Sequence, residues 1–172
     1  MENMIENLKP MRIGVVIAVL AILSGYLLGG AFGKFEDSIK DRIHSQAQAV
    51  FDTVYKSDAA KMKKVTDKSW SYMKRAHLHA NAMGTAALAL ILLLAFIPMK
   101  REIKSAVALC LGLGAFGYGL FWLLAGWTAP AMGSTGDAKE ALKFLAVPSA
   151  GLSIIGVIAT LWFSGKALFS KA

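Results

Sequence analysis

Residues 76–99 read AHLHANAMGTAALALILLLAFIPM, a run without a single Asp, Glu, Lys or Arg. About 20 apolar residues in a helix are enough to cross the hydrocarbon core of a bilayer, so this run can span a membrane. Its first turns carry two of the three histidines of the chain and an asparagine, whereas its second half is almost purely aliphatic. The run therefore predicts a membrane helix with a polar head.

Three further runs lack charged residues: 13–33, 105–136 and 144–165. Strands of a membrane barrel would alternate polar and apolar residues in segments of about ten, and none of the four runs does so. We therefore expect an all-α integral membrane protein, a four-helix bundle in which the whole chain, residues 1–172, forms one membrane domain. The expected spans are residues 13–33, 77–98, 105–128 and 144–165.

Two prolines bear on the ends of these helices. Pro130, followed by Gly133, predicts that the third helix ends near Trp127 or Thr128, before a loop. Pro148 falls in the first turn of the fourth helix, where its missing amide proton costs no hydrogen bond.

The only long polar segment, residues 34–75, separates the first two spans. Its apolar residues recur at helical spacing, which predicts an amphipathic helix that continues out of the first span. These residues are Phe35, Ile39, Ile43, Ala47, Val50 and Val54. A weak break near Ser57 and Asp58 precedes a second helical stretch that leads towards His77. The two helices can lie on the bilayer, bundle above it, or dock onto another subunit.

Composition excludes an ordinary soluble domain, because 56% of the 172 residues are hydrophobic and only 17% are charged. The net charge of +8 fits anionic lipid headgroups better than nucleic acid, because the basic residues flank the spans. Lys9, Arg12, Lys100, Arg101, Lys104, Lys166 and Lys171 would lie on the side of both termini. The positive-inside rule places that side in the cytoplasm, in a cytoplasmic (inner) membrane.

The first span differs from a cleaved signal peptide, because its apolar run is longer than a typical signal core. Tyr26 and Phe32, followed by Lys34, suggest an interfacial anchor. Trp122, Trp127 and Trp162 are likewise expected to be belt aromatics at the ends of their spans. The lone Cys110 excludes an internal disulfide and is expected to be buried.

The head of the second span carries the candidate chemistry. On a helix, His77, Asn81 and Gly84 share one face, whereas His79 and Met83 form a second face about 160° away. The two histidines therefore point in different directions, and one metal ion would not readily bind both of them.

Several site chemistries can be excluded from the residues present. A zinc site needs three or four ligands, and the spans supply neither a Cys cluster nor an inward carboxylate. Nucleophilic catalysis lacks a nearby base and orienting group. A single imidazole can hold a haem iron, because the porphyrin supplies four ligands itself. Small residues would leave room for the macrocycle, although they equally permit close helix packing without one. They are Ala80, Ala82, Gly84, Ala86, Ala87, Gly112, Gly114, Gly117 and Gly119.

The run His77-x-His79-x-Asn81-x-x-Gly84 resembles the haem-ligand helix of small membrane proteins related to haem-copper oxidase subunit I. The wider stretch from Trp70 to Gly84, with Arg75-Ala76-His77, is similar to the second helix of the styrene oxide isomerase family. That resemblance implies a four-helix membrane enzyme that binds haem b through His77, as a homotrimer with haem at the subunit interfaces. The oxidase-like motif instead favours His79 as the ligand.

In the isomerase family a tyrosine and an asparagine orient an epoxide against ferric iron acting as a Lewis acid. Tyr118, in Gly117-Tyr118-Gly119, resembles the family tyrosine by context. The family asparagine does not carry over, because its position falls on Met83. Asn81, two residues earlier, is nevertheless a candidate catalytic residue together with Tyr118.

These observations predict a haem b-binding membrane protein with five-coordinate iron, because the spans offer no obvious sixth ligand. His44, Met99 and Met132 could supply one only if their segments fold inward. The open position would bind or isomerise a small apolar oxygenated ligand such as an epoxide. The alternative is an accessory or electron-transfer subunit that docks onto a larger membrane complex through residues 34–75. No nucleic-acid partner is expected.

Overall fold

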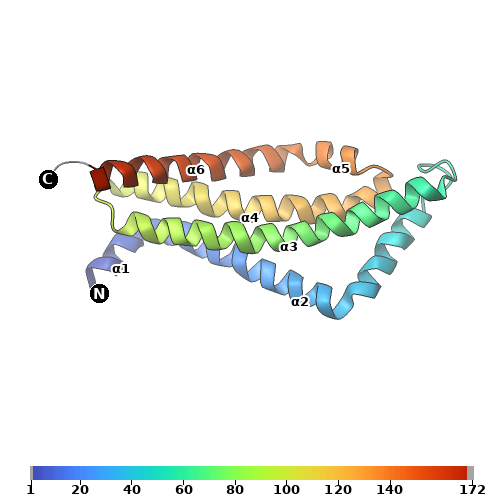
Figure 1. The fold of residues 1–172 in the computed structure, drawn as a ribbon, viewed down its shortest axis with the longest axis horizontal. Helices are drawn as coiled ribbons and strands as arrows, with labels where there is room; N and C mark the ends of the chain where they lie inside the picture. The colour runs from blue at the N-terminus through green and yellow to red at the C-terminus, as the bar shows by residue number, and fades with distance from the viewer. Residues whose placement is uncertain (1, 170–172) are drawn as a thin grey trace.

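The computed structural model describes residues 2–169, and within this range every regular element is helical (Figure 1). The elements are α1 (Glu2–Leu8), the short 3₁₀ helix η1 (Lys9–Met11), α2 (Arg12–Gln48), α3 (Ala59–Ala95), α4 (Arg101–Met132), α5 (Thr135–Ala141) and α6 (Lys143–Phe169). Four of them, α2, α3, α4 and α6, are long and apolar enough to cross a membrane. The all-α membrane bundle is thereby confirmed.

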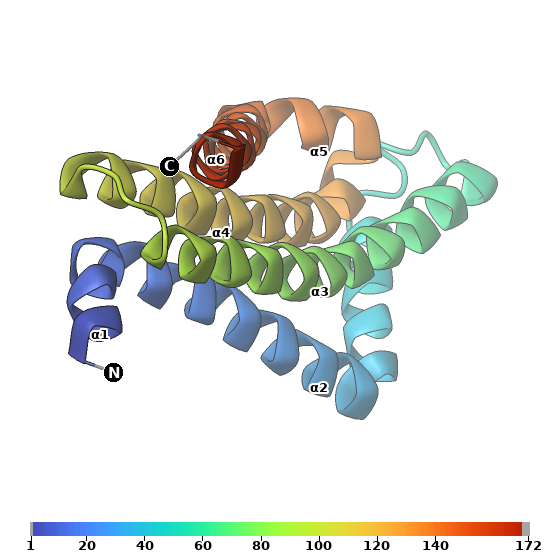
Figure 2. The same ribbon diagram turned by 60° about the vertical axis from the view of Figure 1, so that its left-hand side comes forward.

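The four long helices lie side by side (Figures 1 and 2). The pair α3 and α4 forms the centre, with α2 packed against both of them and α6 packed mainly against α4. The described ends of the chain and the connection between α3 and α4 lie at one end of the bundle, and the turn between α2 and α3 lies at the other (Figure 1). The first and last described residues therefore lie at one end of the bundle, as the four spans predict.

Small residues let α2 approach its neighbours closely. The buried face of its first half consists of Gly14, Ala18, Ala21 and Gly25. A Cβ on Gly14 would lie 2.5 Å from the backbone carbonyl of Ala108 in α4, and one on Gly112 would lie 2.7 Å from the carbonyl oxygen of Gly14. Such backbone contact is typical of membrane helices, where packing rather than hydrophobic burial holds helices together.

Beyond the span, α2 continues as predicted into the polar segment, but it bends at Phe35 (φ −121°, ψ 23°). The bend directs the second half of α2 back towards α3 (Figure 1). We call residues 34–75 the arm. Phe32, Ile43 and Met73 form a buried cluster beneath the bend, with Trp70 packed against it. The two arm helices therefore bundle together.

The tip of the arm is fixed by specific contacts. Asp58 caps α3, because its carboxylate accepts a hydrogen bond from Lys61 N at 2.8 Å. Tyr55 is buried, and its hydroxyl donates to the carbonyl oxygen of Pro130 in α4 at 2.7 Å. Burial raises the pKa of the Tyr55 phenol above its ordinary value. This hydrogen bond attaches the α2–α3 turn to the end of α4.

Three details of the predicted helices were wrong. The third helix does not end near Trp127 or Thr128. Instead, α4 includes Pro130 and ends at Met132, and Gly133, whose φ of 64° is left-handed, caps it. The expected loop after it contains α5, which Ser134 caps by accepting a hydrogen bond from Asp137 N. Pro148 lies in the second turn of α6, because that helix begins at Lys143.

Candidate functional site

The face of α3 that carries His77, Asn81 and Gly84 packs against α2. A Cβ on Gly29 would lie 2.6 Å from Cε1 of His77, and one on Gly25 would overlap the side-chain amide of Asn81. One turn further, a Cβ on Gly84 would lie 2.9 Å from Ile22. The predicted grouping of His77, Asn81 and Gly84 on one face is therefore confirmed.

Sequence reasoning missed the partners of this face on α2. Gly25 and Gly29 stand four residues apart, at the same spacing as Asn81 and His77 on the antiparallel helix α3. The signal was present, because GYLLG at residues 25–29 is a GxxxG sequence in an apolar span, a pattern typical of close helix contact. Phe32 completes the contact: its ring lies edge-on to His77, with the ring centroids 6.5 Å apart.

A hydrogen bond to α2 fixes the orientation of the His77 ring. Nδ1 of His77 lies 2.7 Å from the carbonyl oxygen of Gly25. A carbonyl oxygen only accepts, so Nδ1 carries the proton and donates it. In the neutral imidazole the lone pair then resides on Nε2.

The other ring nitrogen of His77, Nε2, makes no hydrogen bond with the described residues. It lies near α2 as well, because a Cβ on Gly29 would be 3.3 Å from it. His77 itself is half-buried. The arrangement leaves the lone pair of Nε2 without a hydrogen-bond donor, so that it could bind a Lewis acid.

His79 points to α4 instead. Its ring centroid lies 5.2 Å from that of Tyr118 and 6.0 Å from that of Trp122. The guanidinium of Arg75 lies over the Trp122 ring, 5.0 Å from its centroid, and over Tyr72 at 5.4 Å. His79 is therefore held in an aromatic cluster formed by α3 and α4.

The structure thus separates the predicted site residues into two groups. His77, Asn81 and Gly84 contact α2, whereas His79 and Tyr118 lie together against α4. Within one protomer, Tyr118 therefore lies beside His79 rather than in the contact that His77 makes with α2.

Two of the expected belt aromatics are wholly or partly buried in the bundle. Phe32 is only 7% exposed and packs edge-on against Trp70, with ring centroids 5.1 Å apart. Trp122 is half-buried beside Tyr72, and its Nε1 is buried without a partner. Trp162 is 69% exposed, as a belt residue should be.

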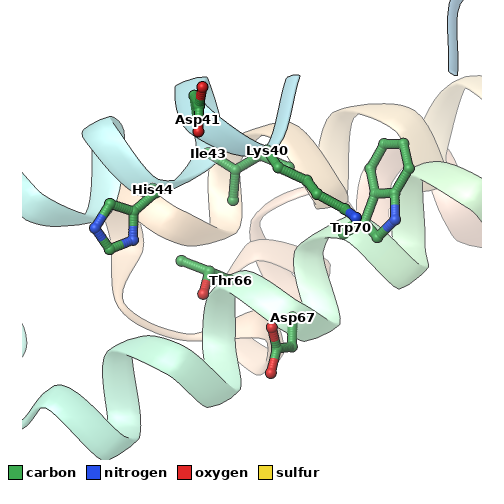
Figure 3. Close-up of a pocket in the computed structure, with 7 residues that line it drawn as sticks. All are labelled: Lys40, Asp41, Ile43, His44, Thr66, Asp67 and Trp70. Atoms are coloured by element: carbon green, nitrogen blue, oxygen red, sulfur yellow. The ribbon is translucent and has the colours of Figure 1, made fainter. Parts of the chain in front are cut away.

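The three candidates for a sixth ligand lie away from His77. Met99 is in the connection after α3, about 30 Å along the helix from His77. Met132 ends α4, beside the tip of the arm. His44 lines a polar cleft of about 230 Å³ between the two arm helices. Figure 3 shows it there with Lys40, Asp41, Ile43, Thr66, Asp67 and Trp70.

Small cavities adjoin the part of α3 that follows the histidines. One of about 80 Å³ lies among α3, α4 and α6, lined by Met83, Leu111 and Ser153 among others. Another of about 50 Å³ is lined by Ser24, Ala80 and Phe116 among others. Both are far smaller than a porphyrin, so a ligand of that size would contact the protomer from outside.

Comparison with known proteins gives no relative to set beside this geometry: no protein family, no curated protein and no solved structure matches the chain.

Proposed function

We propose that the chain is a haem b-binding integral membrane protein and that Nε2 of His77 is the protein ligand of the iron. The observation that carries the proposal is the 2.7 Å hydrogen bond from His77 Nδ1 to the Gly25 carbonyl oxygen. Metal-binding histidines almost always donate their other ring N–H to a carbonyl, a carboxylate or water, which fixes the tautomer and makes the ring a better ligand. His77 donates its Nδ1–H to a carbonyl oxygen in this manner, whereas none of the described residues makes a hydrogen bond that orients His79.

The size of the cavities near His77 suggests where the haem would lie. Because the cavities beside the head of α3 hold only about 80 and 50 Å³, we propose that the haem would lie against the outside of the α2–α3 pair, facing lipid or a second copy of the chain. A homo-oligomer, such as the trimer that the resemblance implies, would shield both faces of the ring. Phe32, edge-on to His77, would form part of the apolar contact.

Haem held by one protein ligand supplies an iron with an open position, which can bind a small molecule or act as a Lewis acid. The substrate class that we propose is a small apolar oxygenated molecule of the epoxide type, which would reach the site from the bilayer. Tyr118 could orient such a molecule at His77 only from a neighbouring copy, because in its own protomer it lies beside His79. The alternative is an accessory or electron-transfer subunit, for which the arm would be the docking element.

We also propose that the protein resides in a cytoplasmic (inner) membrane with both termini in the cytoplasm. The support is the cluster of basic residues at that end of the bundle. Lys9 and Arg12 precede the first span, and Lys100, Arg101 and Lys104 occupy the α3–α4 connection and the start of α4.

The test is the absorption spectrum of the detergent-solubilised protein before and after dithionite. We expect a Soret band that is lost in His77→Ala, retained in His79→Ala, and restored to His77→Gly by added imidazole. His44→Ala is the matched control, because His44 lies in the arm cleft. Added azide should shift the Soret band of the wild-type protein if the sixth position is open.

Each other outcome has a definite meaning. Loss of the band only in His79→Ala would move the ligand to the Tyr118 cluster. Absence of any Soret band after haem reconstitution would eliminate the haem proposal. A low-spin spectrum that does not change when azide is added would favour the electron-transfer subunit.

A further inference from the structure

We propose that Asn81 is a positioning residue whose side-chain amide oxygen shares the Nδ1 proton of His77 with the Gly25 carbonyl, and thereby keeps Nε2 as an unprotonated ligand. The inference rests on the proposed role of His77, but it concerns the tautomer of the ring, which can be measured without haem.

The first step is the position of the proton. Nδ1 of His77 lies 2.7 Å from the Gly25 oxygen and 3.3 Å from Nδ2 of Asn81. The short contact to a carbonyl requires a proton on Nδ1. An amide NH₂ cannot donate to that same nitrogen, because its lone pair is no longer available.

The second step is the orientation of the amide. Oδ1 of Asn81 is buried and has no hydrogen-bond partner. Exchanging the amide nitrogen and oxygen, which have nearly the same size, places Oδ1 at the 3.3 Å position beside Nδ1–H. The exchange converts a contact between two donors into a hydrogen bond. It also turns the NH₂ group towards α2, where the amide N–H groups are already used within the helix and only carbonyl oxygens remain available.

The third step is the role of Gly25. A Cβ at this residue would overlap the outer atom of the Asn81 amide, which is the NH₂ nitrogen after the exchange, and would lie 2.6 Å from Cγ and 2.9 Å from the backbone nitrogen of Asn81. The absence of a side chain lets the Asn81 amide lie flat against α2 while the Gly25 carbonyl reaches Nδ1 of His77. Gly25 therefore allows both its own carbonyl oxygen and the Asn81 amide oxygen to accept the Nδ1 proton of His77.

The consequence is chemical as well as geometric. A ring that lacked these acceptors would be free to carry its proton on Nε2, the nitrogen that must be unprotonated to bind a metal. Two acceptors on Nδ1–H also increase the basicity of the ring. His77 and Asn81, two of the polar residues at the head of the α3 span, thus form one connected group with Gly25.

The experiment uses the full-length chain with His44→Gln and His79→Phe, labelled with ¹⁵N-histidine, so that His77 gives the only imidazole signals. One-bond N–H couplings and ¹⁵N shifts of the haem-free protein report which nitrogen is protonated. We expect Nδ1–H in this background and in the Asn81→Asp variant, and a mixture containing Nε2–H in Asn81→Leu. Thr85→Val replaces an exposed polar residue of the same helix and should not change the tautomer of His77.

Haem titration supplies the second readout. Asn81→Leu should bind haem about 10- to 100-fold more weakly than the background protein, the usual effect of removing an outer partner of a metal-binding histidine. Asn81→Asp should lower the haem reduction potential, because a carboxylate accepts the Nδ1 proton more strongly.

The two proposals fail in different ways. If no variant binds haem while Asn81→Leu changes the tautomer, the haem proposal falls and the positioning role stands. An Nε2–H ring in the background protein would overturn the positioning role. So would an unchanged tautomer with unchanged haem affinity in a folded Asn81→Leu protein. If Asn81→Leu does not fold, an unchanged reduction potential in Asn81→Asp overturns the role.

Discussion

Gly29 faces the imidazole of His77 across the α2–α3 interface so closely that a Cβ there would lie 2.6 Å from Cε1 and 2.9 Å from Nδ1 of the ring. One residue further along the same helix, a Cβ on Gly30 would meet nothing within 4 Å. The two glycines are neighbours in the same helix and differ in what they face. Substituting each of them in turn therefore separates the effect of displacing His77 from the effect of replacing a glycine in α2.

Gly29→Ala should displace the His77 ring and weaken its hydrogen bond to Gly25. Inserting a methyl group into a packed interface typically costs about 1–3 kcal/mol. If haem binds at His77, a loss of that size in binding free energy corresponds to about 5- to 150-fold in affinity. Haem titration and thermal unfolding of the purified protein measure both effects. Gly30→Ala is the control, and equal behaviour of the two variants would show that the His77 contact does not determine the site.

Tyr55→Phe should loosen the attachment of the arm to α4. The substitution leaves the buried Pro130 carbonyl without its 2.7 Å donor, which costs about 1–3 kcal/mol of the free energy of unfolding. Tyr26→Phe is the matched control, since Tyr26 is 69% exposed. Hydrogen exchange of residues 49–58 should rise in Tyr55→Phe alone. Unchanged exchange there would mean that the hydroxyl does not hold the turn.

The same hydroxyl predicts a pH dependence. Burial raises the pKa of Tyr55 in the folded state, so the folded protein holds this proton more tightly than the unfolded chain, whose pKa is about 10. The contribution of Tyr55 to stability is therefore complete below pH 10 and is lost as the pH rises towards the folded pKa. The stability difference between the wild-type protein and Tyr55→Phe should shrink on raising the pH above 10. A difference that stays constant would contradict the assignment.

The small residues of α6 predict how that helix is held. A Cβ on Gly156 would lie 2.7 Å from Cγ of Leu111 in α4, whereas a Cβ on Gly151 would meet nothing within 4 Å. Gly156→Leu should therefore separate α6 from α4 and lower the melting temperature in detergent, at a cost of about 1–3 kcal/mol. Gly151→Leu should leave the melting temperature nearly unchanged. Equal effects of the two variants would mean that helix propensity, rather than the contact with Leu111, determines the change in melting temperature.

Helix existence and helix faces could be predicted because both follow from local geometry. Four uncharged runs of sufficient length predict four membrane helices, and the 3.6-residue repeat places His77 with Asn81 and Gly84, apart from His79. No knowledge of the neighbouring helices is needed for either step. The identity of those neighbours, α2 for His77 and α4 for His79, depends on how the helices pack.

Features that depend on distant contacts could not be predicted. No proline marks the bend of α2 at Phe35 in the sequence. The bend accompanies the packing of Phe32 and Ile43, on either side of it, with Met73 of α3. Pro130 lies inside α4, where the hydroxyl of a tyrosine 75 residues away satisfies its carbonyl oxygen. Trp122 packs edge-on against Tyr72 of the neighbouring helix α3. Each of these contacts joins segments that are far apart in the sequence.

The arrangement of the bundle predicts which residues face each side of the membrane. The α3–α4 connection, with exposed Lys100, and the arm tip, with exposed Thr53, lie at opposite ends (Figure 1). In a Cys110→Ser background, Thr53→Cys should react with an impermeant maleimide added outside spheroplasts, and Lys100→Cys should react only after lysis. This result would follow from the basic residues near Lys100 being retained in the cytoplasm. The reverse pattern would place the termini outside, and labelling of both cysteines from one side would contradict the crossing of the membrane by α3.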